Sequence, residues 1–437
     1  MRSTSAPDRT ATDPCSMSAA RAAREIKEGR LTSEALVQAC LRRIREREPQ
    51  IGAWAYYDAE SALRQARALD RMAPGLRGPL HGIPVGVKDV LDTADMPTTY
   101  NSPIYQGHRP AWDAACVAAT RHAGGIALGK TMATEFANNH PAPTRNPRDL
   151  QRSPGGSSSG SAAAVADFMV PLAIGTQTGG SIIRPAAFCG VVGYKPTFGA
   201  INRAGLKAVA ESVDTIGVIA RSVEDAALFV HAVSGRRLPD FDDQPPPPRI
   251  GFCRSPYWEH ADEATRNLLE TSASRLARAG AKVRDFTLPP EVAGLYTEQD
   301  AIVYFETARA LAYEFHRFPG KISAALSGRL EQGWRYSCED YDAAQHHAEA
   351  ARIMLAAQME GYDILLTPSA HGEAPRWRQP IGDSLFNKNW TLLGLPCVTI
   401  PCGTGPSRLP LGVQIVGPRH ADARTLRYAH WVWQRLG

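Results

Sequence analysis

The chain has 437 residues, of which 43% are hydrophobic and 21% are charged, and its net charge of +5 reflects 49 basic and 44 acidic residues. This composition is typical of a globular protein whose core is large enough that neither disulfides nor metal ions are required for stability. The basic residues form no block, which excludes an extended nucleic-acid footprint, and no apolar stretch is long enough to suggest a membrane span.

The eight cysteines are scattered along the chain and lack the CxxC spacing that is typical of zinc sites. Cys397 and Cys402 lie in an apolar run, where burial is expected rather than metal binding. The sequence therefore predicts neither a metal site nor a cofactor. Residues 1–16 are polar and have no apolar h-region, so we predict a disordered N-terminus, no secretory signal and a cytoplasmic protein.

The next part of the chain, residues 17–75, is predicted to be helical, because apolar residues recur every three or four positions. Thr32 or Ser33 is a suitable N-cap for the second helix, and Pro49 is expected to end it. The predicted helices cover residues 18–28, 32–48 and 58–72.

Residues 76–235 alternate short apolar runs with helical patterns, which indicates an α/β sheet with helices on its faces. We expect this part to form the catalytic core. The predicted strands are 83–87, 125–128, 170–174 and 191–194, and the predicted helices are 114–122, 159–168 and 222–233.

The proline run 245–248 is predicted to be a stiff, extended link within residues 236–362, a peripheral and mostly helical region that we expect to shape the pocket. Apolar runs return in residues 363–437, the C-terminal part of the core. The sequence thus predicts a single large α/β domain over 17–437. The remaining predicted strands are 249–252, 363–367, 397–401 and 413–416, and the remaining predicted helices are 262–279 and 421–435.

Residues 124–131 formally match the phosphate-binding pattern GxxxxGK[ST]. A phosphate-binding loop follows its strand and leaves its backbone free, whereas here Ile126, Ala127 and Leu128 are themselves the expected strand. We therefore interpret the match as accidental and expect no nucleotide.

Two glycine-rich stretches, residues 155–161 and 175–181, carry serines, and Ser181 follows Ser157 by 24 residues. Serine- and glycine-rich stretches are often linkers, but each of these is placed between a predicted strand and a helical pattern, which is typical of a site. The arrangement predicts nucleophilic hydrolysis. Free backbone N–H groups of Thr178, Gly179, Gly180 and Ser181 could then form an oxyanion hole.

Lys88 is the candidate base, because no histidine lies near either loop in the sequence. It lies in an apolar run, and burial of a lysine lowers its pKa toward neutrality. A solvated lysine is the alternative. A Ser-His-Asp triad is the other alternative, but Ser181 lacks the GxSxG context of a nucleophile elbow, and His81 precedes the strand that carries Lys88.

Lys88 in GVKD, Ser157 in GGSSSGS and Ser181 in GGS together resemble the amidase signature family. The resemblance extends over nearly all of the chain and implies a central mixed, twisted β-sheet covered by helices. Further matching segments are residues 129–131, 135–137, 214–217, 220–222, 394–396 and 412–417.

The resemblance also implies a Ser–cis-Ser–Lys mechanism. Ser181 matches the nucleophile, Ser157 the bridging serine after a cis peptide bond at Gly156, and Lys88 the base. The implied activity is hydrolysis of a small-molecule carboxamide through an acyl-enzyme, with release of ammonia or an amine. Two alternatives stay open: the amidase component of a tRNA-dependent amidotransferase, and a non-catalytic binding protein, against which the three intact residues argue. A homodimer is an open possibility.

Two positions depart from the usual pattern of the family. Gln177 stands where aspartate is usual, and Arg184 lies one position later than the usual arginine. Residues 175–185 are more similar to the malonamidase-like branch, in which the equivalent arginine binds the substrate carboxylate. Gln177 and Arg184 are therefore candidate substrate-binding residues. The alternative for Arg184 is a structural pair with an acid in the core.

Overall fold

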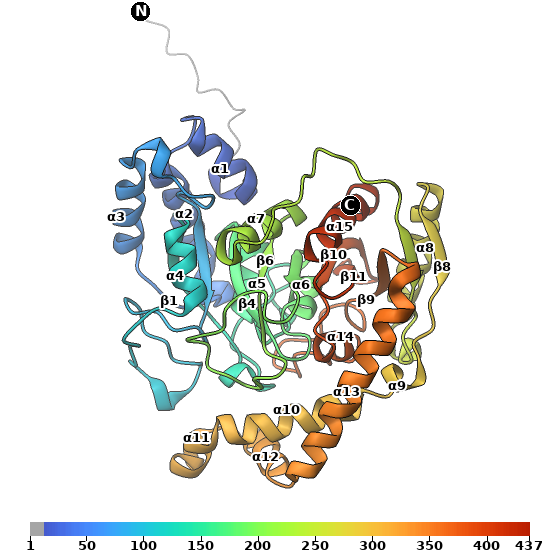
Figure 1. Cartoon of the computed structure of the whole chain (residues 1–437). Helices are drawn as coiled ribbons and strands as arrows, with labels where there is room; N and C mark the ends of the chain where they lie inside the picture. The colour runs from blue at the N-terminus through green and yellow to red at the C-terminus, as the bar shows by residue number, and fades with distance from the viewer. Residues whose placement is uncertain (1–12) are drawn as a thin grey trace, which may run out of the picture.

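The protein is built around an eleven-stranded sheet, seen in a computed structural model that describes residues 13–437 (Figure 1). The strand order is β1-β3-β2-β4-β6-β5-β10-β11-β9-β7-β8. Strand β2 pairs in parallel with β3 and β4, and β7 pairs in parallel with β8 and β9, whereas the other pairs are antiparallel. The prediction of an α/β fold with a mixed sheet and helices is confirmed.

The sequence predicts eight of the strands and misses β1, β6 and β8. β8 has a polar sequence at the exposed edge of the sheet, and β1 has only four residues, so neither carries a clear period-two pattern. The strands are β1 (Trp54–Tyr57), β2 (Pro84–Lys88), β3 (Ile126–Thr131), β4 (Leu172–Gln177), β5 (Val192–Lys195), β6 (Thr215–Ala220), β7 (Arg249–Phe252), β8 (Lys282–Asp285), β9 (Ile364–Pro368), β10 (Cys397–Thr404) and β11 (Pro410–Val416).

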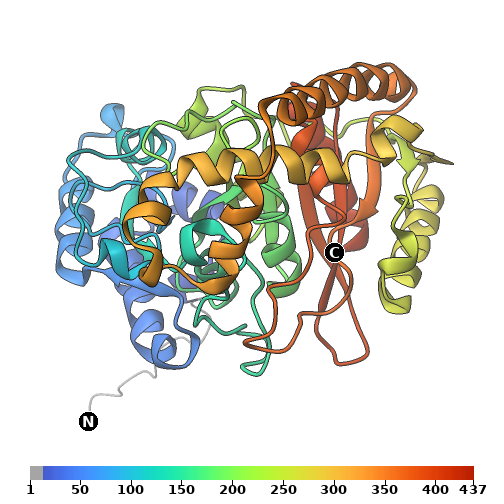
Figure 2. The same ribbon diagram turned by 90° about the horizontal axis from the view of Figure 1, so that it is seen from below.

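Helices cover the sheet, and α10, α11 and α12 lie together at the lower end of the molecule in Figure 1 and toward the viewer in Figure 2. The helices are α1 (Ala19–Lys27), α2 (Ser33–Ile51), α3 (Ala59–Asp70), α4 (Ala115–His122), α5 (Ser159–Ala166), α6 (Ile183–Cys189), α7 (Val223–Ser234), α8 (Glu263–Arg278), α9 (Pro290–Ala293), α10 (Tyr296–Ala310), α11 (Ala312–Arg317), α12 (Ala324–Gly333), α13 (Cys338–Gln358), α14 (Lys388–Leu392) and α15 (Asp422–Leu436).

The structure differs from the sequence-based expectation near the N-terminus. Helix α2 does not end at Pro49 but continues to Ile51, and Gly52 caps it in the left-handed conformation with φ 65°. Disorder was predicted for residues 1–16, but Pro14–Ser16 form a 3-10 helix in which Cys15 is buried. The rest of that prediction, residues 1–12, lies outside the described residues.

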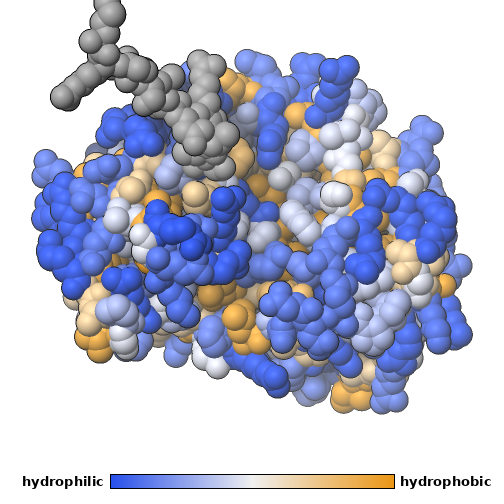
Figure 3. Space-filling model, turned by 90° about the horizontal axis from the view of Figure 1, so that it is seen from above, coloured by the Kyte–Doolittle hydropathy of each residue, from blue (hydrophilic) through white to orange (hydrophobic). Residues whose placement is uncertain are grey.

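The region 236–362 is mostly helical, but it also adds β7 and β8 to the edge of the sheet. Its helices α10 and α12 line a cavity that also contains Ser181. The face seen from above is largely hydrophilic, with apolar side chains only in small groups (Figure 3). Over residues 13–437, no helix is both long and apolar enough to cross a membrane.

Candidate active site

Lys88 is the last residue of β2, a strand that is buried along its whole length. Its Nζ donates hydrogen bonds to Ser157 Oγ and to Thr176 Oγ1, each at 2.7 Å. Burial lowers the pKa of Lys88 from 10.5 to about 7, and the nearby guanidinium of Arg184 acts in the same direction, against the opposing charge of Asp214. The structure thus provides an amine that exchanges a proton near neutral pH and touches the hydroxyl of Ser157.

Ser157 begins the turn that leads into α5, and the peptide bond between Gly156 and Ser157 is cis, as the family resemblance implies. The backbone N–H of Thr134 donates to the Ser157 carbonyl at 3.1 Å, and the N–H of Ser158 donates to the Ser181 carbonyl at 3.3 Å. These bonds fix the first serine loop beside the second.

Ser181 lies in the loop between β4 and α6. The shape of this loop depends on Gln177, whose Oε1 accepts hydrogen bonds from the N–H groups of Ile182 at 2.8 Å and Ile183 at 3.0 Å. The Gln177 amide nitrogen donates to Thr391 Oγ1 at 3.0 Å. Gln177 is fully buried and is not among the residues that line the cavity, so its contacts organise the loop. This placement differs from the substrate contact that the sequence suggested.

The loop presents backbone donors next to the Ser181 hydroxyl. Over the described residues, no acceptor in the protein is found for the N–H groups of Thr178, Gly179, Gly180 and Ser181, the four predicted donors. The space around Gly180 is tight, because an added Cβ would lie 2.4 Å from Asn387 Oδ1 and 3.0 Å from the Cβ of Ser384, and one of these groups or the loop would have to shift. Free N–H groups in a fixed, crowded loop are suited to hold an oxyanion.

The three predicted catalytic residues therefore come together in part. Lys88 and Ser157 are hydrogen bonded, and both are buried. Ser181 faces the cavity, and within the part of the chain that the structure describes its hydroxyl makes no hydrogen bond to Ser157. The two loops are nevertheless in direct backbone contact.

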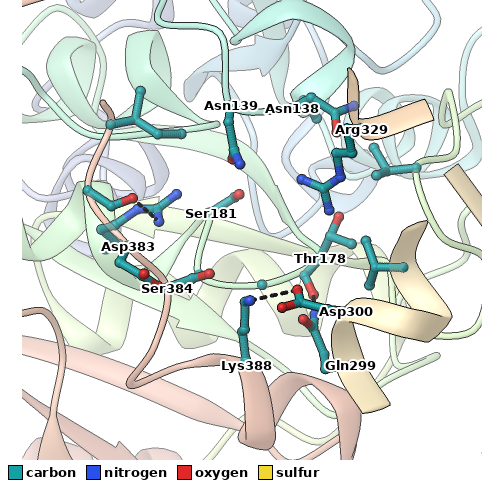
Figure 4. Close-up of a pocket in the computed structure, with 18 of the residues that line it drawn as sticks. Asn138, Asn139, Thr178, Ser181, Gln299, Asp300, Arg329, Asp383, Ser384 and Lys388 are labelled. Carbon is teal, nitrogen blue, oxygen red and sulfur yellow. Dashed lines mark hydrogen bonds and ion pairs between the residues drawn. The ribbon is translucent and has the colours of Figure 1, made fainter. Parts of the chain in front are cut away.

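The cavity has a volume of about 320 Å³, at the lower end of the range for small-molecule sites. Its walls come from the Ser181 loop, residues 137–139, α10, α12 and the segment 380–384 (Figure 4). On one side, Lys388 Nζ lies 2.7 Å from Asp300 Oδ1 and 3.5 Å from the centre of the Tyr296 ring.

Arg184, in α6, is buried and lines the cavity, but its described hydrogen bonds all go to backbone carbonyls. Its Nη2 and Nε donate to the Gly156 carbonyl at 2.6 and 3.2 Å, and its Nη1 donates to the Gly382 carbonyl at 2.6 Å. Burial lowers its pKa to about 10. The guanidinium thus connects the turn before Ser157 to the 380–384 segment. The partners of these three donors are backbone carbonyls and not the buried acidic side chain that the structural alternative predicted.

Sequence reasoning missed Arg329, which reaches from α12 into the cavity (Figure 4). Its guanidinium lies 4.4 Å from the centre of the Tyr304 ring, and its Nε is buried without a partner. No hydrogen bond or ion pair to this side chain is found within residues 13–437, and burial lowers its pKa. No local motif marks Arg329, because its place depends on how α12 packs against α10.

The phosphate-loop match lies elsewhere and is a buried strand, as predicted. All six residues of β3 are buried, and Lys130 donates to the Leu91 carbonyl at 2.7 Å and lies 3.2 Å from Asp89 Oδ1. Over the described residues, no group of three or more His, Cys, Asp or Glu side chains could hold a metal ion.

The family model described as Amidase matches residues 35–426. The chain is 36% identical to a glutamyl-tRNA(Gln) amidotransferase subunit from Acidothermus cellulolyticus, with 96% of this chain and 92% of that protein covered. Among solved structures, one described as an amidase matches with a TM-score of 0.88 at 30% identity, covering 96% of this chain and all of the other. The native peptide amidase from Stenotrophomonas maltophilia matches with a TM-score of 0.85 at 30% identity, over 96% and 97% of the two chains.

Proposed function

The chain belongs to the amidase family, and from this premise we propose that it hydrolyses the C–N bond of a small carboxamide through an acyl-enzyme on Ser181. The observation that carries the proposal is the buried hydrogen bond from Lys88 to Ser157, next to a serine that faces a small cavity. A lysine with a pKa of about 7 is a base matched to neutral pH.

In the proposed reaction, neutral Lys88 takes the proton of the Ser157 hydroxyl while Ser157 takes that of Ser181. The Ser181 oxygen attacks the amide carbon, and the charge that develops on the carbonyl oxygen is held by N–H groups of residues 178–181. The proton returns along the same path to the leaving nitrogen, the C–N bond breaks, and ammonia or an amine departs. Water, deprotonated by the same relay, then cleaves the ester and restores Ser181.

We propose further that the amide bears a carboxylate, which Arg329 binds. A guanidinium that is partly desolvated and unpaired gains strong, paired hydrogen bonds from a carboxylate. Arg184 was the sequence candidate for this role and the basis, with Gln177, of the likeness to malonamidase-like amidases. Three of its five N–H donors already engage carbonyls, so in this proposal Arg184 holds the loops and Arg329 binds the substrate carboxylate.

A second candidate function is the amidase component of an amidotransferase, and the observation that favours it is the 36% identity to a protein of that name. The two candidates differ in what the isolated chain does. A stand-alone amidase releases ammonia from free amides without other proteins, whereas an amidotransferase component is expected to copurify with partner proteins and to depend on them.

The test is ammonia release by the purified chain across a panel of neutral, aromatic and carboxylated amides. The proposal expects turnover without partners, highest for short carboxylated amides, and none for Ser181→Ala. Turnover only in the presence of copurifying partner proteins would favour the second candidate. Undiminished turnover by a folded Ser181→Ala variant would remove Ser181 as the nucleophile.

A further inference from the structure

The turn at residues 134–139 contacts both the loop that contains Ser157 and the start of α12, the helix that carries Arg329. Phe136 and Ala137 have φ angles of 43° and 56°, in the left-handed region that bulky side chains rarely adopt. The Phe136 N–H donates to the Tyr100 carbonyl at 2.9 Å, which holds the turn in this form. Backbone angles of this kind persist only where surrounding contacts hold them. The contacts of this turn therefore identify the elements that it connects.

One end of the turn touches the catalytic loops. The Thr134 N–H donates to the carbonyl of Ser157, and the Thr134 methyl group packs against Gly156, where an added Cβ would lie 3.0 Å away. At the other end, Asn138 and Asn139 line the cavity, to which Ser181 also belongs (Figure 4). The turn is therefore part of the frame that holds the nucleophile side of the site.

Glu135, within the same turn, reaches the opposite wall. It is buried, and its Oε1 accepts the Ser323 N–H at 3.0 Å while its Oε2 accepts the Ser323 hydroxyl. Ser323 is the N-cap of α12, and its Oγ accepts the Leu326 N–H at 3.2 Å. A carboxylate at this position is also favoured by the helix dipole. Both oxygens of Glu135 are thus used to hold the first turn of α12.

Arg329 lies six residues after this cap, or about 9 Å along the helix axis. Glu135 is consequently a short, buried connection between the loop that holds Ser157 and the helix that carries Arg329. A second set of contacts connects the helical region to the core. Glu314 of α11 accepts a hydrogen bond from the Tyr105 hydroxyl at 2.6 Å and lies 2.5 Å from Lys207 Nζ. Because these contacts remain when Glu135 is replaced, we expect its loss to make the position of α12 less well defined without separating α10, α11 and α12 from the core.

We propose that Glu135 is a positioning residue that sets the distance between the guanidinium of Arg329 and the Ser181 nucleophile, and so makes the site selective for short amides bearing a carboxylate. The inference rests on the proposed function, in which Arg329 binds that carboxylate. Glu135 itself does not touch the substrate. Both of its side-chain oxygens accept from Ser323 and neither contacts the serine loops, so we expect its replacement to act on binding of the carboxylate and to leave the chemistry at Ser181 unchanged.

The test uses Glu135→Gln, which keeps the size of the side chain but loses its charge and one acceptor. The kcat and KM values are measured on two amides of equal length, one ending in a carboxylate and one neutral. The expected result is a rise in KM of about tenfold or more for the carboxylated amide, with kcat and KM for the neutral amide within about twofold of wild type. Glu331→Gln, an exposed residue of the same helix, is the matched control and is expected to change neither.

An equal loss on both amides would overturn the inference, because it would make Glu135 merely structural, and so would unchanged kinetics. If Glu135→Gln does not fold, Ser323→Ala removes the same connection from the other side and is judged by the same criteria. Arg329→Met is assayed in parallel. If it leaves the preference for the carboxylated amide intact, the proposed carboxylate recognition fails; if it abolishes the preference while Glu135→Gln does not, only the role of Glu135 fails.

Discussion

Replacement of Lys88 by methionine separates the chemical role of this residue from its effect on stability. Methionine fills nearly the same volume without a charge, so the variant removes the buried amine and little else. We predict that Lys88→Met loses amide hydrolysis and, near neutral pH, is more stable than the wild type. The wild-type kcat should rise with pH through about 7 and then level off, because only the neutral amine accepts a proton.

The size of the stability effect follows from the pKa of Lys88. The fall from 10.5 in the unfolded chain to about 7 in the folded protein corresponds to about 5 kcal/mol. Below pH 7 the amine is charged in both states, so folding bears this whole cost. Between pH 7 and 10.5 the unfolded chain keeps a proton that the folded protein has released, and a rise in pH therefore favours folding. From pH 7 to pH 9 the wild type should gain about 2 kcal/mol relative to Lys88→Met.

The assay is urea denaturation of both proteins at pH 6, 7, 8 and 9. Other buried groups also titrate, so the quantity of interest is the difference in the free energy of unfolding between the two proteins at each pH. Lys27→Met, which changes an exposed lysine of α1, is the control and should differ from the wild type by a constant amount. A constant difference for Lys88→Met would mean that Lys88 keeps its charge over this range, and it would refute the lysine-base mechanism.

Two other substitutions test the cavity. Arg329→Met should raise KM for a carboxylated amide by about 100-fold or less and leave a neutral amide nearly unaffected, as measured by ammonia release; an equal change on both would refute carboxylate binding. Gly180→Ala should lower turnover, because its Cβ would lie 2.4 Å from Asn387 Oδ1 and must displace either the Asn387 side chain or the Ser181 loop. Wild-type kcat in a folded Gly180→Ala variant would show that this loop does not hold the oxyanion.

The sequence predicted those parts of the site that are encoded locally. Lys88, Ser157 and Ser181 lie in short motifs whose glycines and apolar neighbours are visible without a structure, and most strands have clear apolar runs. The cavity wall is different. Arg329 is one of many helical arginines and is far from the serine loops in sequence. It reaches the site only because α12 packs against α10, which lines the same cavity.

The roles of Gln177 and Arg184 also depended on tertiary contacts. Both lie within four residues of Ser181, the proposed nucleophile, which made them candidates for substrate binding. In the fold, the Gln177 amide turns inward to cap the start of α6, and the Arg184 guanidinium meets the Gly156 and Gly382 carbonyls. Proximity in sequence placed these side chains near the site but did not determine which way they point.

The central claim, acyl transfer to Ser181, is tested most directly by mass spectrometry of acid-quenched enzyme during turnover of a slowly hydrolysed amide. We predict a mass increase equal to the acyl group, located on the peptide that contains Ser181 and absent from Ser181→Ala. An adduct located on Ser157 or elsewhere, while Ser181→Ala continues to release ammonia, would contradict it.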